Sequence, residues 1–234
     1  GWRLPFIAGI ALAFVGFLIR RDLQAAGPQQ ERVSIKRLLG AHWRLIAQVG
    51  GFEVFEAIGF YSIFIYLVTY MTRVVGAPEH DALAVTTISM AFVLLVIPLA
   101  ATLSDIIGRK AVLLAAAVCA ALFVWPLFRL MHQRDFSSLL LAQLGLAAII
   151  GLYEGATPAA ATEAFPASAR CTGVALAFNI CMTLFGGTTP MVATWLIARS
   201  GSAMAPAVYM IAAAIISGAV ILTLRETAKA PLKA

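Results

Sequence analysis

The chain has 234 residues, of which 62% are hydrophobic and only 12% are charged, and its mean hydropathy is +0.93. A soluble domain of this length is far less apolar, so the composition indicates an integral membrane protein. The net charge of +6 does not imply a nucleic-acid partner, because membrane proteins gather basic residues in their cytoplasmic loops.

Seven apolar stretches are long enough, or nearly so, to cross a bilayer as helices, which takes about 20 residues. In chain order they run Leu4 to Ile19, Leu45 to Tyr70, Leu83 to Leu103, Val112 to Met131, Leu139 to Ala161, Thr172 to Ile197 and Pro206 to Leu224. The chain begins at Gly1 and enters the first stretch without the basic start of a signal peptide, so we expect a fragment of a longer protein. Seven stretches suggest one helix of a first bundle followed by a complete six-helix bundle.

Lys and Arg residues are concentrated in alternate loops, the set that ends with the C-terminal tail. Since basic residues in short loops stay on the cytoplasmic side, we expect a cytoplasmic C-terminus. The predicted organisation is residues 1–19 as the last helix of an N-terminal bundle, 20–44 as a cytoplasmic link, 45–224 as the six-helix bundle and 225–234 as a cytoplasmic tail. Within the link, we expect an amphipathic stretch around residues 33–39 at the lipid surface.

Two carboxylates interrupt the second stretch. Glu53 and Glu56 lie nine and twelve residues beyond Arg44, which places them about 13 and 18 Å into the membrane. A carboxylate at this depth costs about 2.5 to 3.5 kcal/mol on insertion scales, so each needs a reason to be there. The pair shares one helix face, with Tyr61 and Tyr66 among the surrounding aromatic residues, and burial together with like charge favours protonation of at least one acid. They are the leading proton-coupling candidates, and the alternative is a misplaced helix start that leaves Glu53 at the interface.

A short polar turn separates the third and fourth stretches, reading L-S-D-I-I-G-R-K from Leu103 to Lys110. Its charges fix a turn at one bilayer face, and Gly108 supplies backbone freedom. Asp105 and Arg109 have the residue types and spacing of a charge-assisted clamp that stabilises one of two bundle arrangements. The alternative is that they are solvated loop charges that only set the topology.

The fifth stretch carries Glu154 in the sequence G-L-Y-E-G-A-T-P, about 13 Å from the helix end near Glu163. The flanking glycines and Pro158 weaken the helix, and an acid beside a helix breaker at this depth is typical of a proton or binding site. Tyr153 is a candidate for the cavity wall. The alternative is a structural pairing of Glu154 with a neighbouring helix.

The loop after this stretch holds Glu163 and Arg170, which could form a second clamp, and a Phe-Pro pair at residues 165–166 that ends the helix. In the sixth stretch, Asn179 and Thr183 share a face and could hydrogen-bond a ligand or simply join helices. The sequence G-G-T-T-P at residues 186–190 predicts a kinked helix of the kind that lines a cavity.

The sequence contains no recognisable enzyme or metal-binding motif. The three cysteines and three histidines lack metal-ligand spacing, and there is no G-x-S-x-G elbow. We therefore expect no metal site and no catalytic site, and a membrane-embedded enzyme or a non-transporting membrane fragment is the alternative of another class.

The turn motif D-x-x-G-R-K resembles the loop motif of the major facilitator superfamily, although Ala101 stands where that family usually has glycine. Three further segments are similar to its metabolite:proton symporter family, which includes the proline/betaine, 2-oxoglutarate, citrate and shikimate carriers. These segments are Gly1-Trp2-Arg3-Leu4-Pro5-Phe6, the loop Glu163-Ala164-Phe165-Pro166 followed by Arg170-Cys171-Thr172-Gly173, and Arg225-Glu226-Thr227.

The resemblance implies a twelve-helix fold in the bacterial inner membrane, with this chain as the C-terminal half plus one helix and the missing N-terminal half completing the cavity. It implies symport of a small metabolite by alternating access, driven by the proton gradient without a cofactor. An organic acid is the expected substrate. A proline/betaine-type osmolyte is the alternative, because no intramembrane Arg or Lys stands out as a carboxylate clamp.

Overall fold

The computed structural model describes residues 4–23 and 35–228, which fall into two separate units. The first contributes helix α1 (Leu4–Leu23), which contains the first predicted stretch. The second is a helical bundle. Residues 1–3, residues 24–34 of the predicted link and residues 229–234 lie outside the described part of the chain.

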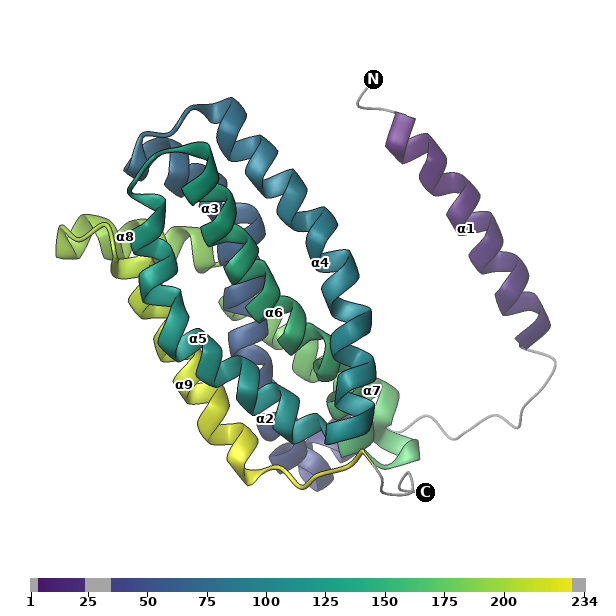
Figure 1. Cartoon of the computed structure of the whole chain (residues 1–234). Coiled ribbons are helices and arrows are strands. Elements are labelled where there is room, and N and C mark those ends of the chain that lie inside the picture. Colours follow the sequence, from purple (N-terminus) through teal and green to yellow (C-terminus); the bar gives the residue numbers. More distant parts are fainter. Residues whose placement is uncertain (1–3, 24–34, 229–234) are drawn as a thin grey trace. The chain divides into compact units, whose positions relative to one another are not determined.

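The bundle consists of long helices joined by short turns (Figure 1). Its elements, with η marking π-helical segments, are α2 (Ile35–Phe60), η1 (Tyr61–Tyr66), α3 (Leu67–Tyr70), η2 (Met71–Val75), α4 (Glu79–Ile107), α5 (Arg109–Met131), α6 (Phe136–Ala164), α7 (Ala167–Cys181), η3 (Met182–Gly186), α8 (Thr189–Ser200) and α9 (Ala205–Thr223). Six spans among the described residues are long and apolar enough to cross a membrane, and they are Gly40–Val75, Glu79–Ile107, Arg109–Met131, Phe136–Ala164, Ala167–Ser200 and Ala205–Thr223. The predicted all-helical, six-helix membrane bundle is confirmed.

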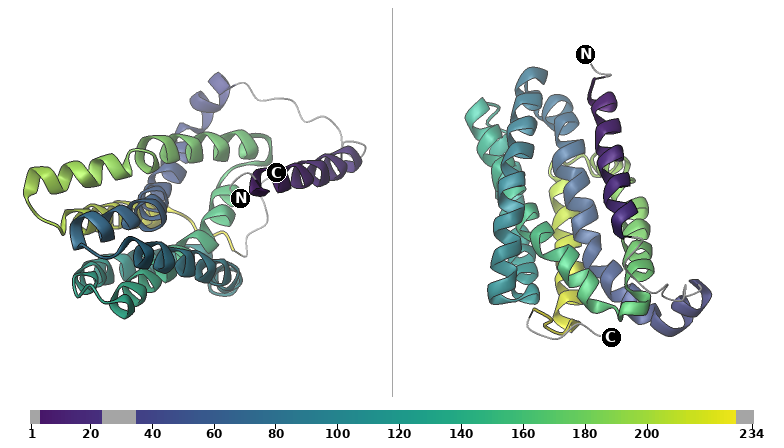
Figure 2. Two further views of the ribbon diagram at one scale, coloured as in Figure 1. Left: turned by 90° about the horizontal axis from the view of Figure 1, so that it is seen from above. Right: turned by 90° about the vertical axis from the view of Figure 1, so that its right-hand side faces the viewer.

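The first span extends beyond the predicted stretch from Leu45 to Tyr70 at both ends. His42 has non-helical backbone angles (φ −126°, ψ 19°), so α2 is kinked there and its first turns lie out of line with the rest (Figure 2). The surface stretch predicted around residues 33–39 has a helical backbone from Ile35 onward, and its side chains lie outside the description.

The π-helical segments are features that the sequence pattern did not predict. Such segments inside α-helices are frequently found at functional sites. In η1, the Ile63 carbonyl accepts a hydrogen bond of 3.1 Å from Gln143, a fully buried side chain on α6. In the predicted sixth stretch, η3 leads into a turn before α8 begins at Thr189, with Pro190 in its first turn, so the expected interruption is present.

Helix α2 packs against α6, α7 and α9, while α4 packs on α6 and α5 contacts both α6 and α9. The core between these helices is formed by large apolar and aromatic side chains, among them the fully buried Phe52, Phe55 and Tyr153. Of the six described spans, Gly40–Val75 has the largest buried share, so groups on α2 are well enclosed by the rest of the bundle.

Short turns fix the two ends of the bundle. Helix α6 ends at Ala164 and α7 begins at Ala167, so the predicted break at Phe165-Pro166 is confirmed. At the opposite end, the Tyr70 hydroxyl donates to the Ala203 carbonyl at 2.9 Å and lies 3.0 Å from Nε2 of His132. These contacts join the outer parts of the first span, α5 and the loop before α9.

Candidate functional site

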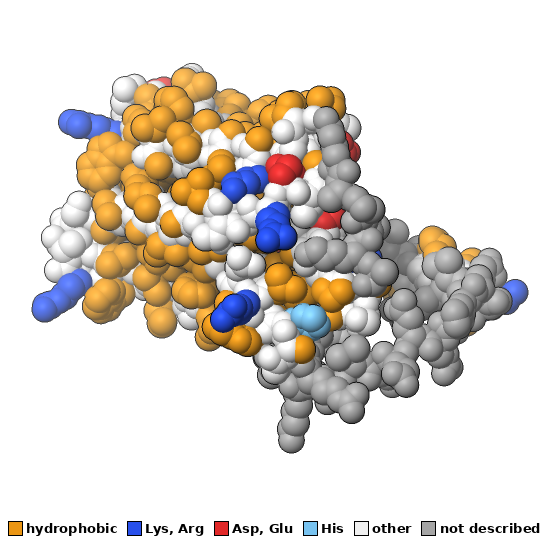
Figure 3. Space-filling model, turned by 90° about the horizontal axis from the view of Figure 1, so that it is seen from below, with side chains coloured by type: hydrophobic (Ala, Val, Ile, Leu, Met, Phe, Trp, Pro, Cys, Tyr) orange, Lys and Arg blue, Asp and Glu red, His pale blue; other side chains and the backbone are white. Residues whose placement is uncertain are grey.

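Charged residues gather in two places. The first is the end of the bundle where α4 ends and α5 begins, which we call the Arg109 end and which lies at the bottom of Figure 1. The second is the inner part of the bundle, where Glu53, Glu56 and Glu154 lie on α2 and α6, and we call these the inner acids. Figure 3 views the Arg109 end, with basic and acidic side chains among apolar ones.

Arg109 is the centre of the first group, and its side chain is only 12% exposed. Its guanidinium meets Asp105 Oδ1 at 2.5 Å and Glu163 Oε1 at 3.2 Å. It also donates to the hydroxyl of Ser104 at 2.7 Å. The Asp105–Arg109 clamp predicted from spacing is therefore present, and it extends to a third helix, α6.

Glu163 links this clamp to the C-terminal segment, because its Oε2 accepts a hydrogen bond of 2.5 Å from the Thr227 hydroxyl. Arg170 donates to the carbonyls of Thr162 and Phe165 at 2.9 and 3.3 Å. Glu163 thus joins Arg109, and the pairing of Glu163 with Arg170 stays a prediction.

The ends of α5 and α9 cap each other. Glu226 accepts hydrogen bonds from the backbone amides of Arg109 and Lys110, at 2.9 and 3.1 Å. Lys110 in turn donates from Nζ to the carbonyls of Leu222 and Leu224, at 2.6 and 2.9 Å. A carboxylate at a helix N-terminus and an ammonium at a helix C-terminus satisfy orphan backbone groups and complement the helix dipoles.

Backbone amides also set the charge state of Glu226. Its partial burial opposes ionisation, but hydrogen bonds from the amides of Ala228, Arg109, Thr227 and Lys110 outweigh that effect and lower its pKa. The side chain is therefore held as a carboxylate by the same groups that it caps.

Gly108 has the backbone angles φ 111° and ψ 148°, a region that is essentially restricted to glycine. A Cβ added there would lie 2.5 Å from Oε2 of Glu226. Glycine at position 108 is therefore needed for two reasons. It allows the backbone angles of the turn, and it leaves room for the Glu226 carboxylate.

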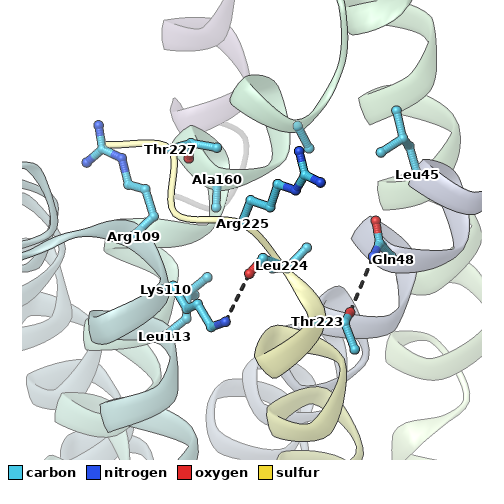
Figure 4. A pocket seen from close by; sticks show the side chains of 11 residues that line it. Leu45, Gln48, Arg109, Lys110, Leu113, Ala160, Thr223, Leu224, Arg225 and Thr227 are labelled. Atoms are coloured by element: carbon cyan, nitrogen blue, oxygen red, sulfur yellow. Dashed lines mark hydrogen bonds between the residues drawn. The ribbon is translucent and has the colours of Figure 1, made fainter. Parts of the chain in front are cut away.

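A pocket of about 260 Å³ opens beside these residues, and the side chains of Arg109, Lys110 and Arg225 lie along it (Figure 4). Gln48 donates to the Thr223 hydroxyl at 3.3 Å on the opposite wall, which joins α2 to α9. The other lining residues are Leu45, Leu113, Ala160, Ala164, Leu224 and Thr227.

The inner acids have a different environment. Glu53 is 1% exposed and Glu56 is 7% exposed, so both are buried inside the bundle. Their depth in the membrane, counted from Arg44, stays a prediction. Oε2 of each is buried without a hydrogen-bond partner among the described residues. A buried carboxyl oxygen without a donor is unusual and points to a proton, a water molecule or a ligand at that position.

Glu56 and Glu154 line the same cavity, which has a volume of about 430 Å³. Tyr61, a candidate cavity residue from the sequence, also lines it, and the remaining lining residues are Phe60, Ile97, Pro158, Phe178 and Met182. Two acids from different helices, α2 and α6, therefore face one space bordered by aromatic rings. Such a space can take a proton, or a small ligand with polar groups.

The other predicted cavity residues lie elsewhere. Tyr153 is fully buried, and its hydroxyl donates to the Phe52 carbonyl at 2.6 Å. Tyr66 is buried with its ring 6.2 Å from that of Tyr70. Asn179 is exposed and donates to the Ala175 carbonyl of its own helix at 2.7 Å.

Thr183 is exposed as well, in η3. Asn179 lines a different pocket, of about 590 Å³, beside Arg170 and Phe178. The structure thus brings Glu56, Glu154 and Tyr61 together in one cavity and places Asn179 in another.

Sequence reasoning missed the contacts of Glu226, Ser217 and Cys181. Glu226 was noted only as part of a C-terminal motif, and its partner amides lie 117 and 116 residues earlier. Ser217 is the one serine of the apolar helix α9, and a lone serine carries no signal of its partner. Cys181 donates to the Gly50 carbonyl at 3.1 Å, a contact that no spacing rule indicates.

Comparison with known families gives a match over nearly the whole chain. The model described as sugar (and other) transporter matches residues 2–234. Two similar curated proteins are citrate-proton symporters, from Salmonella typhi and Klebsiella pneumoniae. Each is 31% identical over 222 residues, which is 92% of this chain and 51% and 50% of those proteins.

A third relative is the ectoine/proline transporter of Corynebacterium glutamicum. It is 27% identical over 251 residues, which covers 99% of this chain and 50% of that protein. The chain spans about half the length of the curated relatives it matches.

Proposed function

Since the chain belongs to the sugar (and other) transporter family of the major facilitator superfamily, we propose that it forms the C-terminal six-helix bundle of a proton-coupled symporter for a small metabolite. This family is one of transporters and not of enzymes. The proposed driving force is the proton gradient, without a cofactor. The proposed partner is an N-terminal bundle, with residues 20–44 as the cytoplasmic link between the two bundles.

One observation carries the proposal: Glu56 and Glu154, on two different helices, face a single open cavity of the bundle. A carboxyl group in an apolar interior without a cationic partner is stable when it holds a proton. Such a group can take a proton when the cavity opens to one side of the membrane and release it when the cavity opens to the other. Glu53, one helical turn away, is the third member of the proposed proton site.

The Arg109 end supplies the proposed gate. Its hydrogen bonds join α4, α5, α6 and the segment after α9, so they stabilise the arrangement in which these ends lie together. An arrangement in which these ends separate lacks those bonds and is favoured only when substrate and proton binding compensate. The proposed gating residues are Asp105, Gly108, Arg109, Lys110 and Glu163. Arg170, near the start of α7, is the proposed second partner of Glu163.

The first candidate substrate is a small organic acid, in keeping with the two citrate-proton symporters among the relatives. A second candidate is a zwitterionic osmolyte, because the cavity walls provide carboxyl groups and aromatic rings, which suit an ammonium group. An organic acid would take its cationic partner from the other bundle.

The chain is an integral membrane protein, and the bacterial relatives favour the plasma membrane. We propose that the C-terminus faces the cytoplasm, because the Arg109 end gathers the more basic set of loops. A reporter enzyme that is active only outside the cytoplasm, fused after residue 234, tests this orientation. We expect no reporter activity, and an active reporter would show that the C-terminus lies outside.

The transport experiment uses the protein expressed from its gene with all flanking coding sequence, purified and reconstituted in vesicles. Uptake of labelled citrate, 2-oxoglutarate, shikimate, proline and betaine is measured with and without an imposed pH gradient. We expect one of them to accumulate only with the gradient. Glu56→Gln and Glu154→Gln should abolish accumulation but retain exchange of internal for external substrate.

Glu79→Gln is the matched control, because Glu79 is an exposed acid in the first turn of α4. It should transport as the unmodified protein does. Gradient-driven accumulation that survives both inner substitutions would contradict the proposed proton site.

A further inference from the structure

Three consecutive carbonyl groups of α2 accept hydrogen bonds from side chains of three different helices. The pairs are Cys181 on α7 with the Gly50 carbonyl at 3.1 Å, Ser217 on α9 with the Gly51 carbonyl at 2.9 Å, and Tyr153 on α6 with the Phe52 carbonyl at 2.6 Å. All three donors are buried. The helical turn that follows directly carries Glu53 and Glu56, so the backbone beside these acids is tied to every helix that packs on α2.

Ser217 acts within the backbone hydrogen-bond ladder of α2. Its hydroxyl accepts from the Phe55 amide at 3.0 Å and donates to the Gly51 carbonyl. An α-helix joins those two backbone groups directly, so the hydroxyl lies within the hydrogen-bonded turn that encloses Glu53. Gly51 permits this approach, because a Cβ there would lie 2.9 Å from Cγ2 of Val220 on α9.

Tyr153 acts one residue further along. The Phe52 carbonyl to which it donates is the α-helical acceptor for the amide of Glu56. The Tyr153 ring also packs edge-on against Phe55, with 5.0 Å between the ring centroids. A shift of α6 therefore acts directly on the backbone turn that orients Glu56.

We propose that Ser217 and Tyr153 are positioning residues of the proton site: they fix the turn from Gly51 to Glu56 and transmit movements of α9 and α6 to Glu53 and Glu56. This inference rests on the proposed proton-binding role of the two acids. The titratable groups facing this turn are Glu154 and Tyr153 from α6 and Cys181 from α7, and α9 contributes the hydroxyl of Ser217. Both residues hydrogen-bond to backbone groups of α2, so the proposed action is through the geometry of that turn.

The first test measures the chemical reactivity of the three acids directly and does not depend on a transport assay. The full-length protein in membranes is treated with a hydrophobic carbodiimide, which reacts with protonated carboxyl groups in apolar surroundings, at a series of pH values. Labelling of Glu53, Glu56 and Glu154 is then measured by peptide mass spectrometry. We expect Ser217→Ala and Tyr153→Phe to change the ratio of Glu56 to Glu154 labelling by about fivefold, the equilibrium effect of one lost hydrogen bond, and to displace its pH profile.

Matched controls separate positioning from a general effect of losing a buried hydroxyl. Ser89→Ala removes a fully buried hydroxyl of α4 that has no hydrogen-bond partner among the described residues. Tyr70→Phe removes a buried tyrosine hydroxyl at the opposite end of the bundle. Both controls should keep the labelling ratio and pH profile of the unmodified protein, and Ser217→Thr, which retains a hydroxyl, should restore them.

A second measurement distinguishes this inference from the proposed function. If the unmodified protein shows no gradient-driven uptake, the proton-coupled function fails, whatever the labelling shows. If uptake is gradient-driven but Ser217→Ala and Tyr153→Phe label as the two controls do, the positioning role is overturned and the function stands. A displaced profile in both variants, with folding confirmed by size-exclusion chromatography, supports the inference.

Discussion

The Arg109 end and the inner acids use carboxylates in opposite ways. Asp105, Glu163 and Glu226 each accept hydrogen bonds from a guanidinium, a hydroxyl or backbone amides. Glu53 and Glu56 lie deeper, and one oxygen of each has no donor among the described residues. Satisfied charges hold a structure in one arrangement, whereas unsatisfied ones are available for exchange with a proton or ligand. Stability and transport should therefore be separable by residue in this bundle.

Gly108→Ala should cause the largest loss of stability. The substitution forces a Cβ into a glycine-only conformation and displaces Glu226, so we expect the free energy of unfolding in detergent micelles to fall by about 3 kcal/mol. Gly76→Ala is the control, because Gly76 also has a positive φ of 81° but no atom lies within 4 Å of an added Cβ. Gly76→Ala should lower the free energy of unfolding by about 1 kcal/mol. Equal losses would show that the Glu226 contact contributes nothing.

Arg109→Lys should have the next largest effect. It keeps the positive charge but loses the fork that binds Asp105 and Glu163 together, with an expected loss of about 2 kcal/mol. The exposed Arg129, in the last turn of α5, provides the control substitution Arg129→Lys, which should be neutral. A double-mutant cycle with Glu163→Gln measures the coupling directly, and strictly additive effects would exclude the clamp.

Glu226→Gln should lower the free energy of unfolding by less, about 0.5 kcal/mol at neutral pH, as expected for the loss of a charge at a helix N-terminus. Because the folded state lowers the pKa of Glu226 below its ordinary value of 4.5, the stabilisation is complete above that value. It is lost as the pH falls through the lowered folded pKa. Melting temperatures of the two proteins should therefore differ from neutral pH down to about pH 5 and converge in stronger acid. A difference that persists unchanged at pH 2 would contradict the charge-based cap.

Glu56→Gln should have the smallest effect on stability, near zero or slightly stabilising, because it replaces an acid that has an unpartnered oxygen with a neutral group of the same shape. The same variant is the one expected to abolish gradient-driven accumulation. Unfolding in micelles and uptake in vesicles, measured on one preparation, test both statements. A loss of stability as large as that of Arg109→Lys would make Glu56 a structural acid, like those of the Arg109 end.

Hydropathy and residue spacing were sufficient to predict the helical bundle and part of the candidate site. Apolar length predicted the six spans, and the two acids that interrupt the second stretch, Glu53 and Glu56, are buried in the bundle. The Asp105–Arg109 clamp followed from four-residue spacing across a helix boundary. In each case the signal is local, since it depends only on residues close together in the chain.

Contacts between distant helices were not predictable in the same way. Membrane helices are apolar around most of their circumference, so the pattern does not identify which face is turned inward. Tyr153 illustrates this: its neighbours suggested a cavity wall, yet its hydroxyl bonds the backbone of α2. The π-helical segments likewise depend on tertiary partners such as Gln143, which the local sequence does not specify.

The contact between Tyr70 and His132 also determines which nitrogen of the imidazole ring carries the proton. The single hydroxyl proton of Tyr70 is donated to Ala203, so the imidazole Nε2 must be the donor in its contact with the Tyr70 oxygen. This selects the Nε2–H tautomer of the neutral ring. The donated protons therefore run in one direction, from His132 at the end of α5 through Tyr70 to the Ala203 carbonyl before α9. This contact couples the outer end of α5 to the loop before α9 through a single side chain of the first span.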